Sequence, residues 1–334
     1  MSLFEKTQYS TSLVIGSEVK EQPFFLALIS FREEYVLQGT PYRGYVLTLQ
    51  DRKGSVEGFL PEKAFSPEYN SLTNRIVAVN GVTLMDNQNE AFIKVDALQM
   101  VEEGSYDSKE FMVGLSDRQR ERYINLLKRE IEAVKGNYRT LLDAVFTDDV
   151  IKAVADRPAS LKEFANYHGG LLAATVSVNH ICRQVANSYK QMDNYLYTKA
   201  IDIDLLQTAA LLFGIGKLRE WTDFPFKKSN EGKMLGTVGC FQKFITEKCA
   251  LSAVTVSDEE RDMLISAVIP TIDNRNQVKA VSKEALILQQ CYQMYKSCDE
   301  YDKAISLYDG DEEIFYSWPL KAYIKRTPDK EVVA

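Results

Sequence analysis

The chain has 334 residues, of which 45% are hydrophobic, 26% charged and 11% aromatic, and this composition is typical of a folded protein rather than a disordered one. The net charge of −7 excludes a globally basic nucleic-acid binder, although a local basic strip stays open. The chain has no signal-peptide pattern, no run of membrane-spanning length, and five scattered cysteines without a CxxC pair. We therefore expect a cytoplasmic protein with reduced thiols and no membrane segment.

The first hundred residues carry β-rich segments separated by turn residues. The pattern predicts five strands, over residues 24–31, 43–51, 54–60, 74–85 and 91–101. The interval 61–73 between the third and fourth segments is typical of a loop with short helical turns. Five strands of this spacing favour a small closed barrel of the OB-fold type over an SH3-like barrel.

From Ser116 onward the hydrophobic period changes from that of a strand to that of a helix. The sequence SDRQ predicts a capping box, with Ser116 as the N-cap and Gln119 reaching back to it. Apolar residues then recur at spacings of three and four up to residue 145, which predicts one long amphipathic helix with Gly136 as its weak point. The stripe is interpreted as a face buried within its own domain, and a coiled-coil seam is the alternative.

After residue 160 the chain predicts helices at about 169–190, 203–213, 234–249, 258–269 and 282–305, and no strands. We thus expect an α+β multidomain protein. Its parts are a five-stranded OB-fold β-barrel over 1–105, linker helices over 106–160, and an all-α helical domain over 161–334.

Six stretches carry a resemblance to a known family. They are LTLQDRKGSVEGFL, YHGGLLAATVSV, DLLQTAALLFGIGKLREW, EGKMLGTVG, SKEALIL and IFYSWP, in this order along the chain. Together they resemble the YhaM-type 3′–5′ exoribonucleases, which join an OB-fold to an HD-type metal phosphohydrolase domain. The resemblance implies an HD-type fold for 161–334, activity on nucleic acid, and a homo-oligomer.

The same resemblance implies that the metal ligands of the family are replaced in this chain. The family's ligand positions fall on Ala174, Phe213, Gly214, Thr237, Thr271 and Ile272, and on Tyr292 or Tyr295. Divalent metals bind imidazole nitrogens or carboxylate oxygens, which none of these residues supplies. Without the metal, no Lewis acid acts on the phosphate and no hydroxide forms at neutral pH. The expectation is therefore a catalytic domain without catalytic residues, metal or cofactor.

Few other side chains could replace this chemistry. The chain holds two histidines, His168 and His180, and both are interpreted as structural or surface residues rather than ligands. Lys217 matches a family lysine that contacts a phosphate, so Lys217 and the nearby Arg219 are candidate phosphate-binding residues. The alternative is that both cations offset the dipole of a helix end.

Aromatic and basic residues on the predicted barrel strands indicate a surface for single-stranded RNA or DNA. The candidates are Phe31, Arg32, Tyr35, Arg43, Tyr45, Arg52, Lys53 and Phe59. Because residues 21–101 contain seven cations and ten acids, we expect such binding to be weak and sensitive to salt.

Four functions fit these observations. The first is a non-catalytic nucleic-acid-binding or scaffolding protein. The second is an active metal-dependent 3′–5′ exoribonuclease with a relocated site, the third is a nucleotide sensor, and the fourth is an assembly partner that uses the stripe over residues 124–145.

Overall fold

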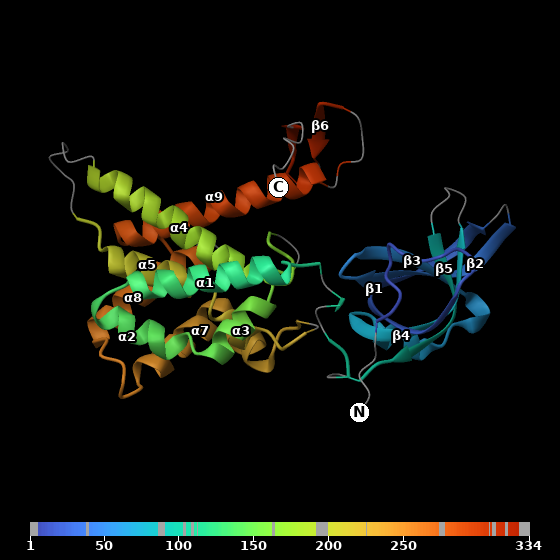
Figure 1. Cartoon of the computed structure of the whole chain (residues 1–334), viewed down its shortest axis with the longest axis horizontal. Coiled ribbons are helices and arrows are strands. Elements are labelled where there is room, and N and C mark those ends of the chain that lie inside the picture. The colour runs from blue at the N-terminus through green and yellow to red at the C-terminus, as the bar shows by residue number, and fades with distance from the viewer. Residues whose placement is uncertain are drawn as a thin grey trace. The chain divides into compact units, whose positions relative to one another are not determined.

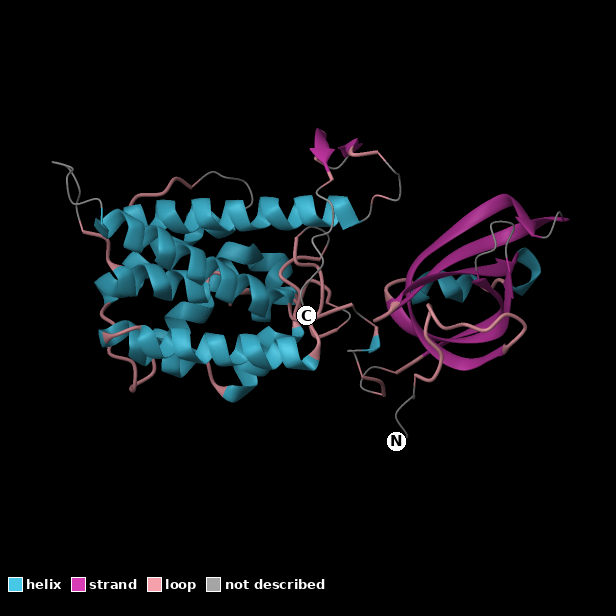
Figure 2. Ribbon diagram, turned by 45° about the horizontal axis from the view of Figure 1, so that its top comes forward, coloured by secondary structure: helices cyan, strands magenta, loops and turns pink. Residues whose placement is uncertain are grey.

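A computed structural model describes residues 6–37, 40–85, 91–102, 105–107, 110–111, 113–161, 164–191, 200–224, 226–273, 278–306, 308, 312–317 and 320–326. The chain divides into two compact units, which Figures 1 and 2 show as strands and helices. The barrel unit comprises Met1–Gly114 with Asp223–Pro225, and the helical unit comprises Leu115–Thr222 with Phe226–Ala334.

The barrel unit contains the five predicted strands. They are β1 (Glu18–Leu37), β2 (Thr40–Asp51), β3 (Gly54–Pro61), β4 (Arg75–Met85) and β5 (Ala91–Met100). They close in the order β1-β2-β3-β5-β4, with β3 and β5 parallel and the other pairs antiparallel. The predicted helical turns are present as η1 (Glu62–Ala64) and η2 (Pro67–Leu72). A closed five-stranded barrel of this kind is the architecture of an OB-fold.

Strand β1 is longer than the sequence pattern indicated, and its pairing with both neighbouring strands is irregular. Its pairing with β2 shifts register between Leu26 and Leu28 and again between Arg32 and Tyr35. A bulge lets one strand bend around the barrel and pair on both sides. Alternate residues of the strands then point into the barrel, where apolar side chains such as Phe24, Leu47 and Val79 are fully buried.

The helical unit begins with three helices, α1 (Asp117–Ala133), α2 (Gly136–Val145) and α3 (Asp148–Asp156). The predicted capping box at Ser116 and Gln119 is present. The prediction of one long helix is wrong: the chain leaves the helix at Val134, and Gly136 has a φ of +64°. Glycine adopts this left-handed conformation at little cost, so the weak point becomes a break.

The apolar stripe of these helices packs inside the unit. Its members from Leu127 to Val145 belong to the main core cluster, and Ile124 packs against that cluster. This placement supports the interpretation of the stripe as a buried face.

The remaining helices are α4 (Gly170–Gln191), α5 (Ile203–Leu212), α6 (Lys217–Glu220), α7 (Asn230–Cys249), α8 (Asp258–Ile272) and α9 (Lys283–Ser306). Helix α5 packs against α2, α4, α8 and α9, and its residues from Leu205 to Leu212 are all buried. The prediction of no strands in this half is wrong. A hairpin of β6 (Ile314–Ser317) and β7 (Ala322–Lys325) follows α9, and its residues alternate between exposed and less exposed positions, as strands do.

Candidate functional site

The helical unit positions its most distinctive residues where α5 ends. Phe213 is the C-cap of α5 and is buried, and the turn that follows leads directly into α6 at Lys217. Gly216 lies in this turn against α7, where an added Cβ would stand 2.9 Å from the backbone nitrogen of Phe241. A side chain at residue 216 would therefore push α6 and α7 apart.

A cavity of about 1000 Å³ opens beside this turn, and we call it the lysine cavity. Residues far apart in the sequence line it together: Phe213 from the end of α5, Thr237 from α7, Thr271 and Ile272 from α8, and Tyr292 from α9. These are five of the positions on which, by the family resemblance, the metal ligands of the family fall. The structure thus gathers them at one place.

Two of the predicted positions lie outside the lining of the cavity. Ala174 is fully buried within α4. Gly214 is also buried, and a Cβ added there would stand 2.5 Å from Cδ1 of Leu171. Tyr295 is not among the lining residues either. Its hydroxyl forms a hydrogen bond with Tyr167, and burial raises its pKa. Of the two tyrosines considered on α9, Tyr292 is the one in the cavity.

The bend that brings Thr237 to the cavity depends on Gly236. The backbone of Gly236 has a φ of +65° and interrupts α7 with a kink. This conformation costs an L-residue energy that glycine does not incur. Past the kink, the hydroxyl of Thr237 donates a hydrogen bond of 3.0 Å to Glu220 in α6.

The oxygen donors of the cavity do not form a metal site. Glu220 accepts the hydrogen bond from Thr237 and lies 3.7 Å from the ammonium of Lys228. Asp273 accepts from the backbone nitrogen of Val278 at 3.0 Å. Across the portions of the chain that are described, no three His, Cys, Asp or Glu side chains come close enough to bind one ion. These residues therefore do not fit a divalent cation.

The two histidines lie elsewhere. His168 is buried, and its Nδ1 lies 2.6 Å from the guanidinium of Arg120, which also pairs with Asp156 at 3.0 Å. His168 therefore belongs to a partly buried polar cluster that joins α1 and α3 to the start of α4. His180 is exposed on α4. Neither imidazole lines the cavity.

Positive charge dominates the cavity. Four lysines line it, Lys217, Lys228, Lys279 and Lys296, whereas the described lining contains the two carboxylates of Glu220 and Asp273. Lys217 is half-buried, donates a hydrogen bond to the carbonyl of Ala159, and has its ammonium 5.1 Å from the ring centroid of Trp221. An anion is the ligand that this charge balance favours.

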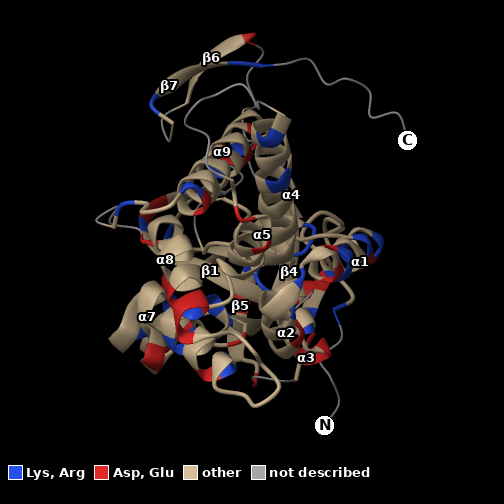
Figure 3. Cartoon of the chain, turned by 90° about the vertical axis from the view of Figure 1, so that its left-hand side faces the viewer, with Lys and Arg blue, Asp and Glu red and all other residues tan. Residues whose placement is uncertain are grey.

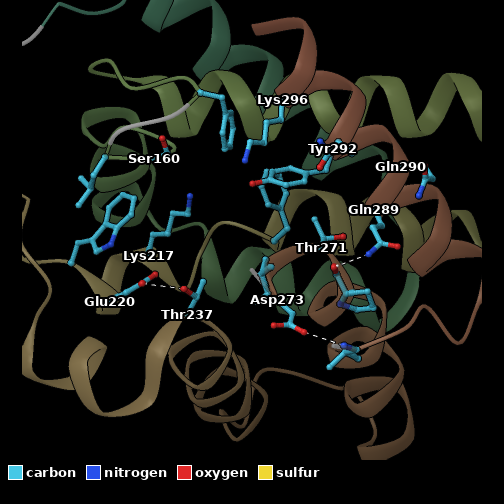
Figure 4. A pocket seen from close by; sticks show the side chains of 18 of the residues that line it. Ser160, Lys217, Glu220, Thr237, Thr271, Asp273, Gln289, Gln290, Tyr292 and Lys296 are labelled. Atoms are coloured by element: carbon cyan, nitrogen blue, oxygen red, sulfur yellow. Dashed lines mark hydrogen bonds between the residues drawn. The ribbon is translucent and has the colours of Figure 1, made fainter. Parts of the chain in front are cut away.

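Three polar groups face the same space inside the cavity. The ammonium groups of Lys217 and Lys296 each lie 5.9 Å from the ring centroid of Phe164. Figure 4 shows the ammonium groups of Lys217 and Lys296 and the hydroxyl of Tyr292 directed toward the same part of the cavity. Sequence reasoning identified Lys217 but missed Lys296, although Lys296 follows Tyr292 by four residues on α9, which places both on one helix face.

Arg219, the second candidate for phosphate binding, points away from the lysine cavity. Its guanidinium pairs with Glu231 at 3.2 Å and also with Glu247. Two carboxylates of α7 thus hold Arg219, and it is not among the lining residues.

The eight candidate residues of the barrel fall into three places. Arg32, Tyr35 and Phe59 share the outer face of β1 and β3. Phe59 is buried because the ring of Tyr35 stacks on it at 4.8 Å. Tyr42, which pairs with Tyr35 across β1 and β2, is 45% exposed and was missed by the sequence analysis.

Three more candidates lie on the opposite face of the same strands. The ring of Tyr45 packs against the interior cluster of the barrel and stacks on Phe65 at 3.7 Å. Phe31 contacts Tyr45 edge-on, and the guanidinium of Arg43 lies 5.2 Å from the ring of Phe31. Arg43 also pairs with Glu62 at 3.3 Å.

The last two candidates occupy the turn between β2 and β3. Arg52 pairs with Glu110 at 3.2 Å, whereas the side chain of Lys53 is exposed. The predicted residues therefore do not form one continuous surface. Phe59 serves as a support for Tyr35 rather than as a stacking platform.

Comparisons with known proteins do not identify a relative by sequence. No family model matches the chain, and no curated protein matches it. Among the described helices, none combines the length and the apolar composition that a membrane span requires.

Solved structures with some likeness include asparaginyl-tRNA synthetase from Pyrococcus horikoshii, in one case complexed with asparaginyl-adenylate. The identities are 12% and 11%, and the TM-scores are 0.24 and 0.23. The alignments cover 82% of this chain but only 63% and 64% of the synthetase chains. At these values the likeness identifies neither a shared activity nor a shared ligand.

Proposed function

We propose that the helical unit binds a phosphate-bearing nucleoside ligand in the lysine cavity without hydrolysing it. The observation that carries this proposal is the convergence of Lys217, Lys296 and the Tyr292 hydroxyl on one space. Two ammonium groups and a hydroxyl donate hydrogen bonds to phosphate oxygens, and bonds of this charged kind are among the stronger ones in proteins.

The shape and the remaining lining of the cavity support a nucleoside rather than inorganic phosphate alone. Its volume of about 1000 Å³ is at the upper end of the range for small-ligand sites. Phe164 and Trp221 offer aromatic surface beside the lysines, and the amides of Gln290 and Gln293 lie in the lining contributed by α9. A phosphate can bind among the lysines while these amides bind the polar edge of a base.

The absence of hydrolysis follows from the chemistry of the lining. Phe213 and Ile272 have no donor atom, and Thr237 and Thr271 offer neutral hydroxyls, which are poor ligands for a divalent cation. We propose, on this ground and on the sequence resemblance, that the helical unit is an HD-type domain without its metal site. The chain is then a non-catalytic relative of YhaM-type exoribonucleases that binds nucleic acid or acts as a scaffold.

The barrel unit offers a second contact for a single strand. Tyr42 and the half-buried Tyr35 lie next to each other on the outer face of the barrel, with Arg32 nearby on β1. Bases can stack on exposed aromatic rings without sequence preference. Because few cations lie among these strands, we propose that this contact is weak and decreases with salt.

Binding to the full-length protein tests the cavity. The ligands are labelled AMP and two short RNA strands, one with a free 3′ end and one with that end blocked. We expect the double variant Lys217→Met/Lys296→Met to weaken ligand binding at least tenfold, while Lys152→Met, an exposed lysine on α3, leaves it unchanged. Binding of AMP identifies a free nucleotide as the ligand. Binding of the RNA with the free 3′ end, without binding of the blocked RNA, identifies the end of a strand as the ligand.

Two results would contradict the proposed function. One is equal binding by the wild type and by the double lysine variant. The other is degradation of the RNA by the pure protein in the presence of Mn²⁺ or Mg²⁺, because this would reveal an active site that the lysine cavity does not supply.

A further inference from the structure

Helix α1 carries an exposed row of arginines that the proposed cavity does not use. Arg118, Arg122 and Arg129, together with Asn125, line a shallow groove of about 460 Å³ along this helix. All four side chains are exposed to solvent. We call this feature the arginine groove, and Figure 3 shows the Lys and Arg positions of α1 in blue.

The helix holds these arginines in a nearly straight line. At 100° per residue, Arg118, Arg122, Asn125 and Arg129 fall within an arc of about 60°. At 1.5 Å per residue, the row from Arg118 to Arg129 extends over about 16 Å. The capping box at the start of α1 and the burial of Leu127 and Ile131 on its opposite side hold the helix in place.

The charge of the groove is largely uncompensated. Arg118 and Arg122 form no ion pair with any residue that the structure describes. Arg129 approaches Glu130 to 3.7 Å, but Glu130 is buried and is bound more closely by Arg183, at 2.8 Å. Glu121 contributes the one carboxylate in the described lining of the groove, against three guanidinium groups.

We infer that the arginine groove binds the phosphate backbone of a single-stranded nucleic acid. Guanidinium groups match the geometry of phosphate oxygens and stay charged at any physiological pH. The choice of nucleic acid among polyanions rests on the proposed function, since the lysine cavity is assigned a phosphate-bearing nucleoside ligand. An anionic membrane fits less well, because the groove contains Leu126 as its apolar residue and lacks the apolar face that membrane binding needs.

Salt-dependent binding by the full-length protein tests this inference. The probe is a labelled 20-nucleotide RNA without secondary structure and with both ends blocked, measured by fluorescence anisotropy between 50 and 200 mM salt. In the variant Arg118→Gln/Arg122→Gln/Arg129→Gln, we expect the slope of log affinity against log salt to fall in magnitude by about 2, because each phosphate contact on a single strand contributes about 0.7. The affinity at 0.1 M salt then falls about 10- to 100-fold.

Matched variants separate the groove from net charge and from the cavity. The variant Lys152→Gln/Lys233→Gln/Lys303→Gln loses the same charge at exposed positions outside the groove and keeps the wild-type slope. The triple Arg→Lys variant of the groove also keeps most of the slope, since the charges remain. Binding of AMP is unchanged in the Arg→Gln variant, so loss of the groove and failure of the cavity are distinguishable.

Three outcomes would overturn the inference. They are no binding of the RNA by the wild type, an unchanged slope in the Arg→Gln variant with a native thermal unfolding transition, and binding of a polyglutamate peptide as tight as that of the RNA. The last outcome would assign the groove to an acidic protein segment.

Discussion

Introducing a histidine and an aspartate at the end of α5 should destabilise the helical unit and should not create a hydrolase. The perturbation is Phe213→His/Gly214→Asp, which places a potential ligand pair at the positions that the family resemblance assigns to it. The five further positions would still provide no imidazole or carboxylate; they are Ala174, Thr237, Thr271, Ile272 and Tyr292.

The magnitude follows from how tightly the two residues are packed. Phe213 is 3% exposed and contacts the ring of Tyr292 at 5.3 Å between centroids, so its replacement by a smaller polar ring costs about 2–4 kcal/mol. A side chain at Gly214 meets Leu171 at 2.5 Å, and the overpacking costs about 1–3 kcal/mol more. The sum is a large part of the free energy of unfolding of an ordinary protein, about 5–15 kcal/mol.

Urea unfolding followed by tryptophan fluorescence measures this loss, because Trp221 is buried in the helical unit. The single variant Gly214→Ala isolates the steric part and should lose about 1–3 kcal/mol. Hydrolysis is assayed with bis-p-nitrophenyl phosphate and labelled RNA in the presence of Mn²⁺. Full stability of the double variant, or Mn²⁺-dependent hydrolysis by it, would refute the conclusion that this end of α5 is a packed and inert position.

Three further outcomes are expected. Burial lowers the pKa of Lys6 to about 8, so the folded barrel releases a proton that the unfolded chain keeps up to about pH 10.5. The free energy of unfolding of the barrel should therefore rise by up to about 3 kcal/mol as the pH increases between these two values. Pulse proteolysis at pH 7.5 and 10 should detect this rise in the wild type and not in Lys6→Met. The exposed Cys298 should react first with a thiol reagent and the buried Cys182 last, because the hydrogen bond with Cys291 and burial raise the pKa of Cys182. Mass spectrometry of labelled peptides measures the order of reaction. Gly236→Ala should cost about 1–2 kcal/mol in urea unfolding through its backbone alone, because an added Cβ there meets no atom within 4 Å.

The barrel shows how much of this protein local sequence pattern determines. Strand β2 is rich in β-forming residues over 43–51, and the DRKG turn joins it to β3, so both strands could be predicted from neighbouring residues alone. The capping box at Ser116 is a local signal of the same kind. The hairpin of β6 and β7 was not predicted, because each strand has only four residues and is too short to show a clear alternation of apolar and polar residues.

Only the tertiary structure determines which side chains lie next to one another. The sequence identified Phe31 and Tyr35 as equal candidates, but the register shift in β1 places them on opposite faces of the sheet. Likewise, Lys217 was recognisable by itself, whereas its approach to Lys296 at Phe164 depends on the packing of α9 against α4 and α5, since the end of α5 leads into α6. Hydrophobic periodicity indicates the conformation of residues that are neighbours in the chain. A site, in contrast, is formed by contacts between residues far apart in the chain, and the packing of the whole unit determines these contacts.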